Sequence, residues 1–274
     1  MSVKSRLAGF RREMRELRAL LRENSWQTCA DLWIDRLLRR RRHRMVRIGG
    51  VALEVRSLSP DVSVALESLG GELRCLELAY PRDSQGVIVD AGGYIGTAAI
   101  AMAQMYPAAT VICIEPSSDN FALLCRNTRA FPNIKPMNAA LVPIGGPERV
   151  SLGDRGTGAW GFTIVGSASD REVRAMESVS AVPIDRVMGL ADRGRVMFMK
   201  MDIEGAEVDI LESIGVLLEH IPILVIELHE RIVPGCEALF MSRCADRFVF
   251  RLEGEKYVAV SAALLRHRAA IGLP

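Results

Sequence analysis

The sequence predicts an α/β fold: a doubly wound, mostly parallel sheet with helices on both faces, preceded by a helical N-terminal arm. Short apolar runs that fit buried strands alternate with helix-like segments from residue 86 onward, which is typical of a parallel sheet. A glycine-rich turn joins the first of these strands to a helix, as in a βαβ unit. Apolar residues spaced by three or four among arginines indicate helices in the first 44 residues.

Composition separates a basic arm from an acidic body. The 274 residues are 49% hydrophobic and 25% charged, which suits one large domain with an appendage. The net charge of +2 is uneven, because the first 47 residues carry 14 Lys/Arg against 5 Asp/Glu. We therefore divide the chain into a basic helical arm (1–47), a hairpin and helix leading into the core (48–85) and a main domain (86–274).

Cysteine usage and hydropathy indicate the compartment. The six cysteines are scattered without a Cys-x-x-Cys pair, which fits reduced thiols and argues against a disulfide frame or a zinc site. The N-terminus lacks the apolar segment of a signal peptide, and no apolar run is long enough to cross a bilayer. We expect a cytoplasmic protein without a membrane span.

The arm ends in a nearly continuous basic run, Arg39 to Arg44. We interpret it as the solvated end of a helix, where cations are favourable. Peripheral contact with a membrane surface or a polyanion is the alternative. Nucleic acid is not an expected partner, because no aromatic residues interleave the arginines as stacking platforms. The sequence is also compatible with a homodimer.

The stretch from Gly86 to Ser117 is the most informative part of the chain. A first strand ends at Asp90 and a second ends at Glu115, with a helix between them. The turn after Asp90 contains the glycines Gly92, Gly93 and Gly96, which let a ligand approach the backbone at the N-terminus of the helix. An acid at the end of the second strand is where ribose hydroxyls are usually held.

The charge at this turn indicates which cofactor binds. NAD would place its pyrophosphate beside Asp90, and the two like charges would repel each other. S-adenosylmethionine has no phosphate and carries an ammonium and a sulfonium, so a carboxylate at the turn helps it to bind. Asp90 and Glu115 therefore favour S-adenosylmethionine over NAD.

A second motif follows the apolar strand near residue 200. Lys200, Asp202 and Glu204 alternate with apolar residues, so an extended chain places them on one side, and Gly205 allows a sharp turn. Such charges at a buried strand end are costly unless they are paired or functional. The structural interpretation is a Lys200–Asp202 ion pair with Glu204 capping the next helix. Mg²⁺ bound by Asp202, Glu204 and Glu227 is an alternative that we do not favour.

Three further residues or segments are candidates with a structural and a functional interpretation. His229 ends the next strand as a structural residue or as a general base, for which its neutral form at pH 7 would be suited. Tyr94 packs over the turn. Residues 143–169 are rich in glycine and form a candidate substrate lid, in which Trp160 anchors the loop or stacks on the substrate.

Five stretches between Gly86 and about Arg231 together carry a family resemblance: Val89–Gly96, Ile114–Ser117, Asn138–Leu141, Lys200–Glu207 and Val225–His229. The sequence resembles the FkbM-type methyltransferases, a family of S-adenosylmethionine-dependent O-methyltransferases. The turn departs from the family pattern, because Gly93-Tyr94 stands where an Ala-Asn pair is common.

The resemblance implies a seven-stranded, Rossmann-like methyltransferase sheet in which the fourth and fifth strands flank the first. Asp202 and His229 would face the methyl group bound over Gly92, and Asn138 and Ala139 would lie near the adenine. The expected cofactor-binding residues are Asp90, Gly92, Gly93, Tyr94, Gly96, Glu115, Pro116, Ser117, Asn138 and Ala139.

We predict an S-adenosylmethionine-dependent O-methyltransferase that acts on a hydroxyl of a small metabolite, a sugar or a polyketide-like acceptor. Asp202 or His229 would remove the hydroxyl proton, with Glu204 orienting the base. Two alternatives stay open: an NAD(P)-dependent oxidoreductase, and a non-catalytic or RNA-directed protein with the same fold.

Overall fold

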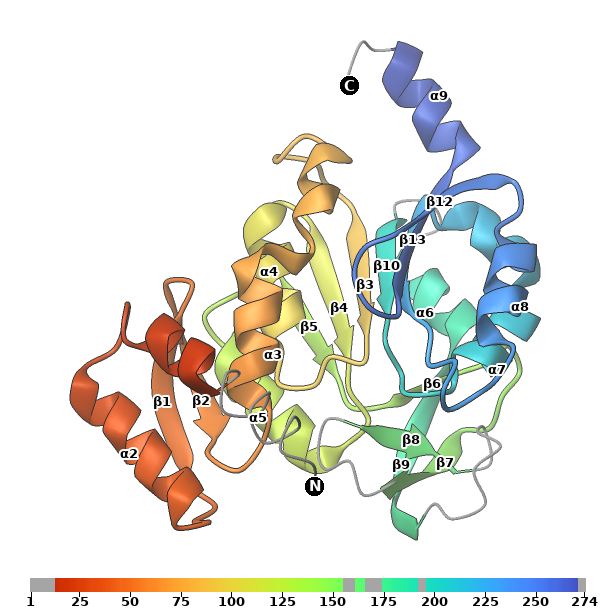
Figure 1. Cartoon of the computed structure of the whole chain (residues 1–274). Coiled ribbons are helices and arrows are strands. Elements are labelled where there is room, and N and C mark those ends of the chain that lie inside the picture. Colours follow the sequence, from red (N-terminus) through yellow and green to blue (C-terminus); the bar gives the residue numbers. More distant parts are fainter. Residues whose placement is uncertain (1–12, 155–160, 166–173, 192–195, 271–274) are drawn as a thin grey trace.

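The computed structural model describes residues 13–154, 161–165, 174–191 and 196–270, and its centre is a seven-stranded sheet (Figure 1). Five strands run parallel in the order β5-β4-β3-β10-β11, and β13 and then β12 continue the sheet antiparallel beyond β11. The strands are β3 (Val87–Ala91), β4 (Thr110–Ile114), β5 (Ile134–Met137), β10 (Val196–Met201), β11 (Ile223–Glu227), β12 (Arg247–Arg251) and β13 (Lys256–Ser261). The predicted sheet is confirmed, except that β11 lies one strand beyond β10 and does not itself flank β3.

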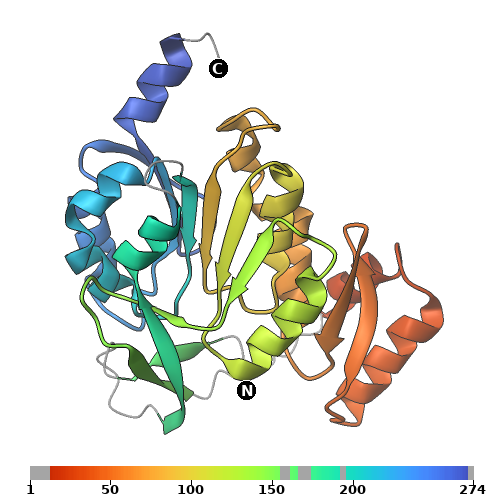
Figure 2. The same cartoon turned by 180° about the vertical axis from the view of Figure 1, so that it is seen from behind.

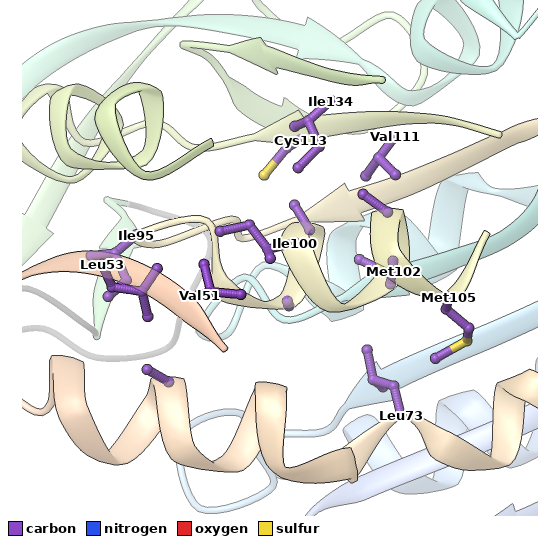
Figure 3. Packing of buried hydrophobic residues seen from close by; sticks show 14 of the residues in the cluster. Val51, Leu53, Leu73, Ile95, Ile100, Met102, Met105, Val111, Cys113 and Ile134 are labelled. Carbon is purple, nitrogen blue, oxygen red and sulfur yellow. The ribbon is translucent and has the colours of Figure 1, made fainter. Parts of the chain in front are cut away.

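Alternating apolar residues cover both faces of this sheet. Ile88 packs with Ile100 in one core, whereas its neighbour Val89 packs with Ile210 in a second core. The first core surrounds α4 (Figure 3). The helices are α4 (Thr97–Met105) and α5 (Ser118–Thr128) against the first core and α6 (Ile184–Leu190), α7 (Glu207–Ser213) and α8 (Cys236–Arg243) against the second. Such two-sided burial is what a doubly wound fold requires.

The N-terminal region ends in a hairpin that joins the main core. Helix α2 (Trp26–Leu37) is followed by β1 (His43–Ile48) and β2 (Val51–Arg56), which pair across Gly49-Gly50. Both glycines have positive φ, as a tight hairpin turn requires. Val51 and Leu53 pack into the first core (Figure 3). The predicted hairpin is confirmed, but the arm boundary placed at residue 47 falls inside β1.

The arginine run does not form the end of a helix. Helix α2 ends at Leu37, Arg39 turns the chain with a φ of 51°, and Arg44 already belongs to β1. A non-glycine residue with positive φ marks a break from helical geometry. The basic residues therefore lie on a connection between α2 and the hairpin.

A broken helical segment follows the hairpin and leads to the central sheet. It consists of α3 (Asp61–Glu67), the π-helical η1 (Ser68–Glu72) and the 3₁₀-helical η2 (Arg74–Leu78). The sequence predicts one helix here, but Gly71 has a φ of 108°, which no continuous right-handed helix accommodates. The break lies inside η1, shortly before η2 begins.

A second sheet lies beyond the carboxyl ends of the parallel strands (Figure 1 and Figure 2). Its order is β6-β9-β7-β8, with β6 (Ala140–Val142), β7 (Arg149–Asp154), β8 (Phe162–Ile164) and β9 (Arg174–Pro183). Residues 134–142 form two strands separated at Asn138-Ala139, so that β5 belongs to the central sheet and β6 to the second sheet. The candidate lid thus contains β7 and β8, whereas Trp160 lies outside the described residues.

Residues 13–20 are also helical, and two further short helices are η3 (Gly215–His220) and α9 (Ala262–Ala270). Among the described residues, every helix is too short or too polar to cross a bilayer.

Candidate active site

A cavity of about 290 Å³ lies at the carboxyl ends of β3, β4, β10 and β11. Helix α3 and η1 line one side of it, and Leu152, Phe162 and Ile164 of the second sheet line another. This is the position where open α/β sheets bind ligands. The cavity therefore joins the glycine turn, the ends of four strands and the candidate lid in a single site.

The glycine turn forms the floor of the cavity. The N–H groups of Gly92 and Gly93 both donate to the carbonyl oxygen of Ile114, at 3.0 and 2.9 Å. A Cβ at Gly92 would lie 1.7 Å from the carbonyl oxygen of Asp202, and a Cβ at Gly93 would lie 2.4 Å from Cys113 Sγ. The turn thus needs glycine because it packs between the ends of β4 and β10, which leaves peptide groups at the cavity surface.

Glu115 is buried beside this turn and is held by protein donors. Its Oε2 accepts a hydrogen bond from the Tyr94 N–H at 2.8 Å, and its Oε1 accepts from the Ser117 N–H at 2.9 Å and from Asn120 Nδ2 at 3.3 Å. Burial raises the pKa of Glu115 to about 7, although these hydrogen bonds oppose the rise. Carboxylate oxygens have further lone pairs, so Glu115 can still accept hydrogen bonds from ribose hydroxyls.

Asp90 does not line the cavity. It is fully buried beneath the turn, and its Oδ1 lies 3.3 Å from Lys200 Nζ. No donor among the described residues reaches that oxygen with hydrogen-bond geometry, so the contact is an ion pair. Burial raises the pKa of Asp90, and the Lys200 ammonium opposes the rise. The sequence predicts a direct contact between Asp90 and the cofactor, but Asp90 lies beneath the turn and outside the cavity.

The predicted cofactor residues fall into two groups. Those that line the cavity are Gly92, Gly93, Tyr94, Glu115, Pro116 and Ala139. Those that support it from outside are Asp90, Gly96, Ser117 and Asn138. Ser117 caps α5, and Asn138 Nδ2 donates to the carbonyl oxygens of Glu115 and Pro116 at 2.9 and 3.0 Å. Asn138 therefore fixes the backbone after β4.

Lys200 lies between two carboxylates at the end of β10. Its Nζ is 3.3 Å from Asp90 Oδ1 and 3.6 Å from Asp202 Oδ2. Burial would lower the pKa of Lys200, but the two carboxylates outweigh burial and raise it. The Lys200–Asp202 pair that the sequence predicts is present. Asp202 nevertheless lines the cavity, so it is both paired and accessible to a ligand.

His229, buried at the end of β11, is surrounded by carboxylates. Its Nδ1 is 3.0 Å from Glu207 Oε1, and its Nε2 is 3.5 Å from Glu204 Oε2 and 4.0 Å from Asp202 Oδ1. Burial would lower the pKa of His229, but Glu207 and then the other carboxylates outweigh burial and raise it to about 9. The surrounding carboxylates therefore favour the imidazolium form of His229, which does not suit the role of a neutral general base that the sequence suggests.

Glu207 holds this histidine, a role that the sequence did not reveal. It lies in the first turn of α7 and is buried, and it accepts hydrogen bonds from the N–H groups of Ile203 and Gly205 at 3.0 and 2.8 Å. The only local feature of the sequence that pointed to Glu207 was its place as an acid in the first turn of a helix that follows a strand. Glu207 thus ties His229 to the turn before α7, and α7 begins without the side-chain cap that the structural interpretation assigned to Glu204.

Asp202 and Glu204 have opposite electrostatic environments. Burial raises the pKa of Glu204 to about 7 against the influence of His229. For Asp202, Lys200 and His229 outweigh burial and lower its pKa. Glu204 has a φ of 55°, so its backbone is held in a region that few residues other than glycine adopt. Both side chains line the cavity.

Two side-chain groups that the sequence did not predict brace the cavity wall. The Tyr94 hydroxyl contacts Asp61 of α3, which also accepts from Arg56 Nη2 at 2.9 Å. Glu72 of η1 contacts Lys256 of β13, and Lys256 Nζ lies 3.5 Å from Glu227 Oε2. These pairs join segments that are distant in the sequence, so α3 and η1 are fixed against the central sheet.

The charge of the cavity lining fits S-adenosylmethionine. Six carboxylates face two ammonium groups there: Glu67, Glu72, Glu115, Asp202, Glu204 and Glu227 against Lys200 and Lys256. An acidic lining favours a ligand that carries a sulfonium and an ammonium, and it repels a pyrophosphate. The cavity lining as a whole therefore favours a positively charged cofactor, and Asp90 contributes only through its ion pair with Lys200.

Comparisons with known proteins find similar sequences. The model of the methyltransferase FkbM domain matches residues 90–248, more than half of the chain. Methyltransferase 1 of Beauveria bassiana (strain ARSEF 2860) is 28% identical over 179 residues, which cover 57% of this chain and 70% of that protein.

Two solved structures are similar to this chain over part of its length. TYW2 of M. jannaschii, in complex with AdoMet, has a TM-score of 0.40 and 14% identity over 80% of this chain and 83% of its own. The PH0793 protein of Pyrococcus horikoshii has a TM-score of 0.27 and 20% identity over 36% of each chain. At these identities the likeness concerns the fold alone.

Proposed function

The chain belongs to the FkbM methyltransferase family, and we propose that it transfers the methyl group of S-adenosylmethionine to a hydroxyl of a small metabolite, sugar or polyketide-like acceptor. The observation that carries the proposal is the pair Asp202 and Glu204, two carboxylates in one cavity with the glycine turn. A hydroxyl must lose its proton when it is methylated, and a carboxylate with a pKa near neutral can accept that proton.

The cofactor would be held at the end of the cavity formed by Gly92, Gly93, Glu115, Pro116 and Ala139, which we call the cofactor end. Glu115 would accept hydrogen bonds from the ribose hydroxyls, and the apolar surface of Pro116 and Ala139 would contact the adenine. When bound, S-adenosylmethionine supplies a methyl group activated by the sulfonium. The protein then has to orient the acceptor, which can contribute ~7–11 kcal/mol to the barrier reduction.

The acceptor hydroxyl would be oriented and deprotonated beside the turn, at the part of the cavity lined by Lys200, Asp202 and Glu204, which we call the acceptor end. His229 lies behind these carboxylates. Glu204 has a pKa of about 7 and is the better matched general base. Asp202 has a lowered pKa, so it stays ionised and accepts the hydrogen bond that orients the hydroxyl. The roles predicted for these two residues are thus exchanged, and His229 holds both carboxylates in place.

The wall of the second sheet supports an acceptor with an apolar part. Leu152, Phe162 and Ile164 line the cavity from β7 and β8, within the segment predicted to be a substrate lid. A polyol alone would leave this apolar surface without a partner. An acceptor with a hydroxyl near Asp202 and a hydrocarbon portion on β8 would fill both parts of the cavity.

Mg²⁺ has no part in the proposed mechanism. Ligand atoms of Asp202, Glu204 and His229 lie within 4.8 Å of one another, a spacing that a cation could bridge. His229 is held as an imidazolium by Glu207, however, and it supplies positive charge to the same carboxylates. We therefore expect a chelator such as EDTA to leave the methyl-transfer rate unchanged; a rate that falls and is restored by Mg²⁺ would overturn this part of the proposal.

Two measurements test the function. Calorimetric titration should show that S-adenosylmethionine binds and that NAD binds far more weakly. Incubation with S-adenosylmethionine and a library of hydroxylated small molecules, followed by mass spectrometry, should yield products that have gained one methyl group on oxygen. Equal or tighter binding of NAD, or methylation only of nitrogen or carbon, would contradict the proposal.

A further inference from the structure

Within the part of the chain that the structure describes, helix α2 leaves one of its faces exposed. Cys29 and Leu32 are buried, and Asp35 is buried with its carboxylate 2.7 Å from Arg44 Nη2 of β1, so this side packs on the hairpin. The other side exposes large apolar side chains. Their exposed fractions are 70% for Trp26, 39% for Trp33, 47% for Ile34, 74% for Leu37 and 52% for Leu38. We call these five residues the α2 apolar face.

Three of the five residues lie along one line of the helix. On a helix with 3.6 residues per turn, Trp26, Trp33 and Leu37 fall within about 40° of one another, Ile34 lies about 60° from Leu37, and Leu38 directly follows the helix. Leu21 and Met45, which flank α2 in the sequence, are also exposed. Singly exposed apolar residues are common on protein surfaces, but five large ones on a single short helix, two of them tryptophans, indicate a binding surface.

Four exposed arginines, Arg39 to Arg42, follow the helix directly. Arg42 lies 3.9 Å from a carboxylate oxygen of Asp35. Across the described parts of the chain, no ion pair involves Arg39, Arg40 or Arg41. The α2 apolar face is therefore bordered at its C-terminal end by uncompensated positive charge.

An apolar face beside a run of exposed arginines limits which kind of partner can bind here. A second copy of the chain packed through this face would cover the apolar side chains, but the face offers no run of acids to pair with Arg39–Arg42. An anionic lipid surface satisfies both features, because leucine and isoleucine enter the acyl boundary, tryptophan prefers the interface and arginine attracts the headgroups. We propose that α2 and Arg39–Arg42 dock this methyltransferase onto an anionic membrane surface.

The surface is separate from the active site. Helix α2 does not line the cavity, and it lies at one edge of the molecule, beyond the hairpin (Figure 1). Docking would thus hold the enzyme at a membrane without changing the residues that bind cofactor. The two functions can be measured independently, so that failure of one leaves the other intact.

Vesicle co-sedimentation of the full chain tests the proposal. The probes are vesicles of phosphatidylcholine alone and of phosphatidylcholine mixed with phosphatidylserine. We expect binding to the mixed vesicles to be at least ~10-fold tighter and to weaken with added salt. In a Trp160→Phe background, where Trp26 and Trp33 are the remaining tryptophans, the emission should shift to the blue on binding.

Variants of surface residues test whether the α2 apolar face and the arginine run contact the vesicles. Leu37→Ser and the double variant Arg40→Glu/Arg41→Glu should each lower vesicle affinity at least ~10-fold. Val216→Ser, at a position with 73% exposure on η3, should not change it. All variants should keep the melting temperature and the calorimetric affinity for S-adenosylmethionine of the original chain.

Three results would overturn the proposal. The first is equal or absent binding to the two kinds of vesicle. The second is an unchanged affinity in Leu37→Ser. The third is a concentration-dependent dimer in analytical ultracentrifugation that Leu37→Ser dissociates, which would assign the α2 apolar face to a second copy of the chain.

Discussion

The cofactor end and the acceptor end of the cavity stabilise their carboxylates by different means. At the cofactor end, Glu115 accepts hydrogen bonds from two backbone N–H groups and one amide. At the acceptor end, Asp202 and Glu204 face the charged groups of Lys200 and His229. Burial raises a carboxyl pKa at both ends, and it is opposed by hydrogen-bond donors at Glu115 and by the charge of His229 at Glu204. We therefore expect substitutions at the cofactor end to change affinity and substitutions at the acceptor end to change turnover.

The largest expected effect belongs to Glu204. Glu204→Gln removes the proposed base, so kcat should fall ~10³-fold while the affinity for S-adenosylmethionine stays unchanged. Steady-state kinetics with the acceptor from the product screen, together with calorimetry, measure both. Glu212→Gln, at an exposed position of α7, is the matched control. A kcat within a few-fold of that control would remove Glu204 from the mechanism.

The second-largest expected effect belongs to Asp202. Asp202→Asn keeps the shape of the side chain but removes the charge that orients the hydroxyl, and kcat should fall ~10²-fold. Lys200 retains Asp90 as a partner, so the melting temperature should change little. Asp246→Asn serves as an exposed control. If the melting temperature falls steeply and the activity of the folded fraction is unaltered, Asp202 is a structural partner of Lys200 only.

His229 connects the acceptor end to stability. Its pKa is raised from 6.5 to about 9, so its contribution is fully present below pH 6.5 and is lost as pH rises through 9. The free energy of unfolding should therefore decrease between these values, by on the order of 2 kcal/mol more in the original chain than in His229→Gln. Urea unfolding across this range measures the difference, with His220→Gln as control. Parallel curves for the original chain and His229→Gln would refute the charge assignment.

The smallest expected effect is at the cofactor end. Glu115→Gln preserves the side-chain shape but weakens the hydrogen bonds to the ribose, so the Kd for S-adenosylmethionine should rise ~10-fold. The kcat at saturating cofactor should stay within a few-fold. Calorimetry measures the Kd and steady-state kinetics measures kcat, both for this variant and for the exposed control Glu219→Gln. A loss of kcat without a change in Kd would abolish the distinction between the ends.

The local patterns of the sequence predicted the sheet and much of the site, because strand ends and turns are encoded by neighbouring residues. The run of period-two charges placed Asp202 and Glu204 at the end of β10, and the glycines placed the turn beside Glu115. The protonation of His229 could not be predicted in this way. It depends on carboxylates from separate segments, and the one that dominates, Glu207, is also held by the backbone of the preceding turn.

The N-terminal region shows the same limit. Helical periodicity predicted α2, but it could not show that Leu32 faces the hairpin while Leu37 faces outward. Glu16 provides a second example, because it contacts Ser63 on the helix that lines the cavity. Long-range contacts of this kind leave no period in the sequence.

The pH dependence of kcat in the original chain and in Glu204→Gln tests the central difference between the two ends most directly. We expect kcat of the original chain to rise with pH through an apparent pKa near 7, because Glu204 must be ionised to accept the proton. In Glu204→Gln that rise should disappear, whereas in Glu115→Gln it should persist. A rise that persists in Glu204→Gln, or a flat profile in the original chain, would contradict the account.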